Sequence, residues 1–197
     1  MVLILNYNSL KRIEETTLPS GKWISLEIAQ DLIYLHFNNV ELGNPKYDKD
    51  LPLSIRFAQN SFISFFYNDI WDIDFISNYD FTKNSILENF SFKIKSFKFL
   101  DFQFLNQIFS YYDYEKTLSL NPDIDVHNIR NDFFLIFGTD KLSVVVGGDS
   151  MDFYNRTERL DDDTLKELSN QWVLYYLDYW SSKRIKKDLM CEKHPFK

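Results

Sequence analysis

The 197-residue sequence contains 5 glycines and 1 cysteine. Glycine lets a backbone approach a phosphate closely, and neither G-x-x-x-x-G-K nor G-x-G-x-x-G occurs in the chain. A glycine-rich nucleotide loop is therefore not expected. The single cysteine, Cys191, cannot form a disulfide within the chain, which favours a reducing compartment.

Long apolar runs and a basic leader are also missing. No apolar stretch approaches the roughly 18 residues of a membrane span. The opening residues, MVLILNYN, have no basic segment before their apolar run. The apolar run is also too short for a signal peptide. We therefore expect a soluble cytoplasmic protein with no membrane partner.

Aromatic residues and acidic charge are what the sequence has in excess. The 19 Phe, 12 Tyr and 4 Trp make up 18% of the chain, which predicts an aromatic core. The formal charge is −7, and residues 101–150 contribute most of it, with 3 Lys and Arg against 8 Asp and Glu. An acidic surface repels nucleic acid and anionic membranes and speeds encounter with a basic partner, although such a charge also keeps a small domain soluble.

Alternation of apolar and polar residues predicts strands in the first half of the chain. Residues 51–57 alternate with the two-residue period of a half-buried strand, and residues 62–67 continue the β character. The same alternation begins at residue 90 and changes parity at Ser96. We expect a bulge or strand break there, because it would restore a single buried face.

A hairpin is predicted in the second half. Residues 133–137 and 142–146 are β-branched and aromatic runs joined by a short polar loop. Residues 151–155 are expected to add a third strand after a turn at Gly147 and Gly148.

Two segments favour helices. Residues 25–37 have apolar side chains at roughly four-residue spacing, although the run LIYLHF would also suit a strand. A stronger helix follows Asp161, Asp162 and Asp163, which are N-cap candidates. Its apolar positions recur at three- and four-residue spacing and are Leu165, Leu168, Trp172, Tyr175, Tyr176 and Tyr179.

These elements predict one α+β domain over residues 1–197, an antiparallel sheet with the long C-terminal helix packed on it. Parallel βαβ units would need helices between successive strands, and residues 51–155 show mostly strand patterns.

Three polar groups have the residue types of a metal or catalytic site. Asp123, Asp125 and His127 alternate, so an extended chain would project them from one face, where they could hold a divalent metal or only form the wet side of a strand. The aspartates of NDIWDIDF lack the glycine and the terminal Glu of a calcium loop. Cys191 and His194 have ligand-like spacing, but zinc needs about four ligands. We expect no metal or other cofactor.

The segment SYYDYEKTLSLNPDID combines tyrosines with carboxylates. Tyrosine supplies large, stiff contact area with a polar tip, and neighbouring carboxylates can meet a basic partner. The same tyrosines would also suit a loop that caps the core. The predicted partner-binding residues are Tyr111, Tyr112, Asp113, Tyr114, Glu115, Asp123 and Asp125.

The profile of a small, acidic, aromatic-rich, glycine-poor chain resembles the immunity proteins of bacterial polymorphic toxin systems, including contact-dependent growth inhibition. The stretch WVLYYLDYW at residues 172–180, followed by KKDLMCE, is similar to the closing helix of such a family. The resemblance implies a non-enzymatic, stoichiometric inhibitor that binds the toxin domain of its own system, often a basic nuclease.

Two alternatives belong to other classes. One is a metal-assisted hydrolase that uses Asp123, Asp125 and His127. The other is a phage or plasmid inhibitor of a host nucleic-acid enzyme, which would share the acidic face but differ in its target. Direct binding of nucleic acid by this chain is not expected, because its net charge is negative.

Overall fold

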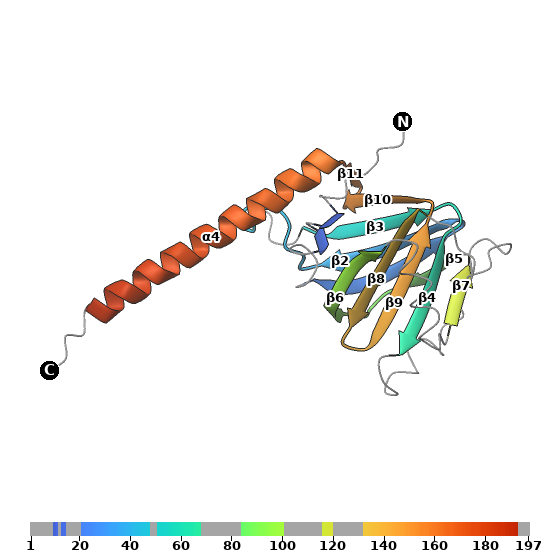
Figure 1. Cartoon of the computed structure of the whole chain (residues 1–197), viewed down its shortest axis with the longest axis horizontal. Helices are drawn as coiled ribbons and strands as arrows, with labels where there is room; N and C mark the ends of the chain where they lie inside the picture. The colour runs from blue at the N-terminus through green and yellow to red at the C-terminus, as the bar shows by residue number, and fades with distance from the viewer. Residues whose placement is uncertain are drawn as a thin grey trace.

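The computed structural model describes residues 10–11, 13–14, 21–47, 51–67, 84–100, 116–119 and 132–192. In this part of the chain, 11 strands form an antiparallel sheet and a long helix follows them (Figure 1). The predicted α+β class is confirmed. The strands are β1 (Lys22–Ala29), β2 (Leu32–Asn38), β3 (Leu53–Ala58), β4 (Phe62–Tyr67), β5 (Asn84–Leu87), β6 (Phe92–Leu100), β7 (Lys116–Ser119), β8 (Phe133–Thr139), β9 (Leu142–Gly148), β10 (Ser150–Asn155) and β11 (Glu158–Leu160).

The strand order is β11-β10-β3-β2-β1-β6-β8-β9-β4-β7, with β5 paired to β1. The helix predicted over residues 25–37 is wrong, because β1 and β2 form a hairpin there that turns at Gln30, where φ is 56°. Both strands also pair with other strands, β1 with β5 and β6 and β2 with β3. These long-range ladders decide between two local patterns that the sequence supports about equally.

The sheet bends where two strands pass directly into the next. Strand β3 continues into β4 through Gln59 and Asn60, which have φ values of 60° and 51°, and β9 continues into β10 beside them. The amide of Asp149 donates to the carbonyl of Gln59 at 2.9 Å and joins the two bends. The turn predicted at Gly147 and Gly148 is therefore wrong, since both residues belong to β9.

Glycine is required at the bend because the two strands approach closely. A Cβ on Gly148 would lie 3.0 Å from the carbonyl oxygen and 3.2 Å from the nitrogen of Ala58. Strands that switch direction in this way make the corners of orthogonally packed sheets. The corner lets the two halves of the sheet face each other.

The core between the two halves is aromatic, as expected. Phe37 of β2 packs edge-on against Phe137 of β8 with ring centroids 5.7 Å apart, and Trp23 of β1 meets Phe137 at 5.2 Å. The expected bulge in β6 is confirmed, since its register with β8 shifts between Ile94 and Ser96. The shift leaves both Ile94 and Phe97 buried.

Helix α4 (Asp162–Glu192) begins where the sequence predicts. The amide of Thr164 donates to the Asp161 carboxylate at 2.8 Å, and this hydrogen bond lowers the pKa of Asp161. Leu165 packs into the core, and the amide of Gly43 donates to the carbonyl of Leu168 at 2.9 Å.

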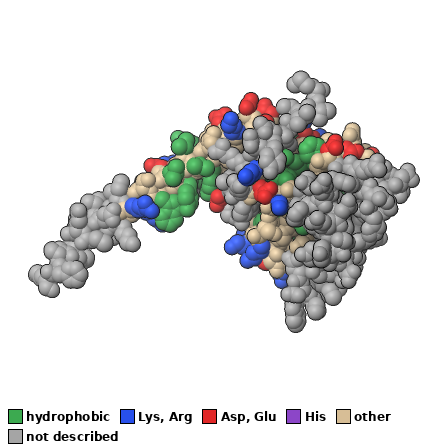
Figure 2. Space-filling view, in the orientation of Figure 1, with side chains coloured by type: hydrophobic (Ala, Val, Ile, Leu, Met, Phe, Trp, Pro, Cys, Tyr) green, Lys and Arg blue, Asp and Glu red, His purple; other side chains and the backbone are tan. Residues whose placement is uncertain are grey.

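Helix α4 contacts the body at its first turns and through Lys46, which bonds Asp178, so it does not lie across the sheet as expected. The inner faces of the folded sheet cover each other, and α4 contacts the segment around Gly43 instead. The rest of the helix projects away from the strands, with hydrophobic side chains along it (Figures 1 and 2). None of the helices in the described ranges has the length and hydropathy needed to cross a bilayer.

Candidate partner-binding face

The outer surface of strands β1, β2, β3, β10 and β11 carries two rows of aligned polar side chains. In the first row Glu27 pairs with Tyr34, Tyr34 with Arg56 and Arg56 with Asp152. In the second row His36 pairs with Ser54, Ser54 with Tyr154 and Tyr154 with Arg159. We call these eight residues the polar face. Side chains alternate along a strand, so the residues between them point into the core.

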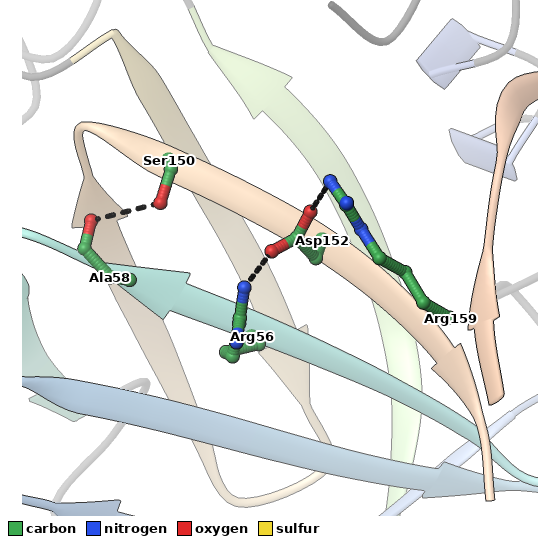
Figure 3. Close-up of polar contacts among 5 residues, drawn as sticks. All are labelled: Arg56, Ala58, Ser150, Asp152 and Arg159. Atoms are coloured by element: carbon green, nitrogen blue, oxygen red, sulfur yellow. Dashed lines mark hydrogen bonds and ion pairs between the residues drawn. The ribbon is translucent and has the colours of Figure 1, made fainter. Parts of the chain in front are cut away.

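Asp152 lies between two guanidinium groups (Figure 3). One carboxylate oxygen accepts from Arg56 and the other from Arg159. The Asp152 side chain is only 8% exposed, whereas those of Arg56 and Arg159 are 27% and 44% exposed. The carboxylate therefore sits beneath the two cations and fixes their positions.

Arg56 has further partners in the same rows. Its guanidinium lies over the Tyr154 ring, 5.4 Å from the centroid, in cation–π geometry. Burial alone would lower the pKa of Arg56, but the contacts with Asp152, Tyr154 and Tyr34 raise it overall. Arg56 is thus held as a cation between two tyrosines.

His36 connects the second row to Glu27. Its Nδ1 lies 2.7 Å from the Ser54 hydroxyl oxygen, and its Nε2 lies 3.8 Å from the Glu27 carboxylate. The imidazole stacks on Tyr34, with ring centroids 6.1 Å apart and an interplanar angle of 2°. Burial lowers the pKa of His36, and the carboxylates of Glu27 and Glu88 oppose the shift.

A serine, a histidine and a carboxylate in contact also suggest a nucleophile with its base. The geometry does not favour that chemistry. Ser54 is buried in a strand that is paired on both sides, so the neighbouring amides are used in sheet hydrogen bonds and cannot stabilise an oxyanion. The 3.8 Å separation also exceeds a hydrogen bond from His36 to Glu27. The contact is better suited to fixing side chains than to activating a hydroxyl.

The residues predicted from the sequence lie elsewhere in the chain. Tyr111, Tyr112, Asp113, Tyr114, Glu115, Asp123, Asp125 and His127 are outside the described residues, as are the aspartates of NDIWDIDF and His194. Cys191 lies in the last turn of α4. Within the described ranges, no group of three His, Cys, Asp or Glu side chains is placed to hold a metal ion.

Sequence reasoning did not identify the polar face. Its members come from five strands between Glu27 and Arg159, and their alignment depends on register. The available signal was the alternation of Tyr34 and His36 with apolar neighbours in LIYLHF, which the helix interpretation set aside. Comparisons with protein-family models, curated proteins and solved structures found no match.

Proposed function

We propose that the chain is a stoichiometric protein inhibitor of the immunity type, which binds a cognate toxin, a basic nuclease domain, and performs no reaction of its own. The polar face carries the proposal. Tyrosine and arginine dominate the energetic hot spots of protein interfaces, and the face presents Tyr34, Tyr154, Arg56 and Arg159 together.

The dimensions of the face favour a macromolecular partner. Neighbouring strands are about 4.8 Å apart, so five adjacent strands spread these side chains over roughly 19 Å. A small ligand is normally enclosed in a pocket, whereas a protein covers a broad surface. The two rows of the polar face form a broad surface of the kind that a protein partner covers.

The side chains of the face are already ordered before a partner arrives. Asp152 positions both arginines, and Ser54 and Tyr34 hold His36. A side chain that is fixed in advance loses less conformational entropy on binding. The contacts within the rows therefore favour affinity as well as stability.

Charge supports a basic partner. The chain carries a formal charge of −7, which steers a basic domain toward it. The face itself contains Glu27 and Asp152 against two arginines, so it would supply specific contacts and the rest of the acidic surface would supply attraction. The tyrosine-rich acidic segment at residues 111–125 remains the partner contact that the sequence predicts.

The experiment is a calorimetric titration of this chain with the proposed partner, a basic nuclease toxin domain identified from a neighbouring gene. The paired substitution Tyr34→Ala and Tyr154→Ala should weaken binding at least about tenfold, or about 1.4 kcal/mol. Lys95→Ala, at an exposed position of β6, is the control and should bind as the wild type does. Circular dichroism confirms that each variant is folded.

Two results would contradict the proposal. Absence of binding by the wild-type chain to that domain would overturn the inhibitor function. Unchanged binding by the folded tyrosine variant would overturn the polar face as the contact. The substitutions Tyr112→Ala and Asp113→Asn would then show whether the predicted acidic segment carries the binding instead.

A further inference from the structure

Helix α4 carries a stripe of rings that continues beyond the body. Residues spaced three and four apart lie on one side of a helix. Leu165 and Leu168 occupy that side in the first turns and contact the core. The same side continues through five residues that we call the aromatic stripe: Trp172, Tyr175, Tyr176, Tyr179 and Trp180.

Part of the aromatic stripe faces solvent. Tyr176, Tyr179 and Trp180 are 49%, 42% and 46% exposed. Isolated apolar residues on a surface are ordinary, but a contiguous patch marks an interaction site. Figure 2 shows hydrophobic side chains gathered along this half of the helix, with Lys or Arg beside them toward its end.

The stripe is ordered by contacts within the helix and with the segment around Gly43. Centroids of the Tyr176 and Trp180 rings lie 6.0 Å apart, and those of Tyr179 and Trp180 lie 5.8 Å apart. Lys183 Nζ lies 4.6 Å from the Tyr179 centroid. Near the body, Lys46 Nζ bonds the Asp178 carboxylate at 3.1 Å. The rings form a prepared surface.

The projecting end of α4 and the rest of the chain have opposite net charges. Residues 170–197 contain 6 Lys and Arg against 3 Asp and Glu, a formal charge of +3. Residues 1–169 contain 16 against 26, a formal charge of −10. Exposed carboxylates at the helix root include Asp161, Asp163 and Glu167. One end of α4 is therefore attracted to the remainder of another copy.

We infer that the aromatic stripe of α4 binds the stripe of a second copy in antiparallel orientation and forms a two-fold dimer. Residues 172–192 span roughly 30 Å at about 1.5 Å per residue, long enough for rings to pair over several turns. Antiparallel pairing brings the basic end of each helix to the acidic body of the other copy. Two-fold symmetry makes each favourable contact twice.

The same charges decide against the basic toxin as the occupant of this stripe. Lys183 and Arg184 follow the rings directly and would repel a basic domain. A second copy supplies carboxylates instead. The dimer is therefore separate from the proposed inhibitory contact, which uses the polar face on the strands.

The size of the interface predicts a reversible dimer. A Tyr or Trp buries about 150–250 Å², and roughly half of each of three rings per copy is still exposed. The area falls below the roughly 1,200–2,000 Å² of tight complexes. We expect a dissociation constant on the order of micromolar, increased by salt because charge contributes.

The test is sedimentation equilibrium of the full chain over a concentration series, which needs no toxin. The wild type should change from monomer to dimer as concentration rises. The paired substitution Tyr176→Ala and Tyr179→Ala should leave a folded monomer. The matched control is Leu174→Ala, because Leu174 is 67% exposed and lies roughly half a turn from the stripe. This control should dimerise as the wild type does.

Charge-reversal variants distinguish this dimer from one that is built on another surface. The paired substitution Lys183→Glu and Arg184→Glu should weaken the dimer at least about tenfold at low salt. A monomeric wild type at every concentration, or a dimer that survives loss of both tyrosines, would overturn the inference. A monomer that co-sediments with phosphatidylserine vesicles would also overturn it and would identify an anionic lipid surface as the occupant.

Discussion

Asp152 shows at the scale of one residue how the polar face is assembled. Its nearly buried carboxylate accepts from both Arg56 and Arg159. We expect Asp152→Asn to lower the free energy of unfolding by about 1.5–3 kcal/mol, because two cations lose their shared anion. This is less than for a fully buried pair, since water reaches both arginines.

Urea denaturation measures this change. Glu158→Gln is the control, because Glu158 is exposed on β11 next to Arg159 and should change stability by no more than about 0.5 kcal/mol. Equal stability of Asp152→Asn and the control would contradict a structural role for the paired arginines.

His36 predicts a pH dependence at the same scale. Burial lowers the pKa of His36 below the ordinary value near 6.5, although Glu27 and Glu88 oppose the shift. The folded state therefore disfavours the protonated ring. The resulting stabilisation is present above about pH 6.5 and is lost as pH falls through the folded pKa. Urea denaturation below about pH 6.5 should show a steeper loss of stability for the wild type than for His36→Gln. Identical slopes would show that the imidazole does not contribute.

At the scale of elements, the corner between β9 and β10 depends on close packing around Gly147. Phe62 and Phe134 pack directly on Gly147, where an added Cβ would lie 2.8 Å from the Cδ1 of Phe134. Gly147→Ala should therefore lower the free energy of unfolding by about 1–3 kcal/mol through overpacking. Thermal or urea denaturation of this variant, with Lys95→Ala as the control, tests this prediction. Equal stability of the two variants would show that the corner can accommodate a Cβ and would contradict the prediction.

Elements were predictable where the deciding signal is local. The period of residues 51–57, the parity change at Ser96 and the cap at Asp161 each report a nearby backbone preference, and the structure confirms all three. The segment 25–37 and the pair Gly147–Gly148 were interpreted wrongly because distant strands decide them. Local spacing carries little information about such pairing.

The candidate surfaces belong to the whole molecule and were harder to predict. The polar face exists only when β1, β2, β3, β10 and β11 lie in register. The helical spacing from Leu165 to Tyr179 correctly predicted an apolar side of α4, but spacing cannot tell whether the body reaches far enough to cover it. Helix α4 projects beyond the strands (Figure 1), and Tyr176, Tyr179 and Trp180 are 49%, 42% and 46% exposed.

Inhibition stoichiometry is the most direct test of the inhibitor proposal. The nuclease activity of the proposed toxin domain is measured while the chain is added in increasing amounts. We predict a linear fall to the background rate at one chain per toxin, and a shallower curve for the Tyr34→Ala and Tyr154→Ala variant. Full nuclease activity at a large excess of the folded wild-type chain would contradict the proposal.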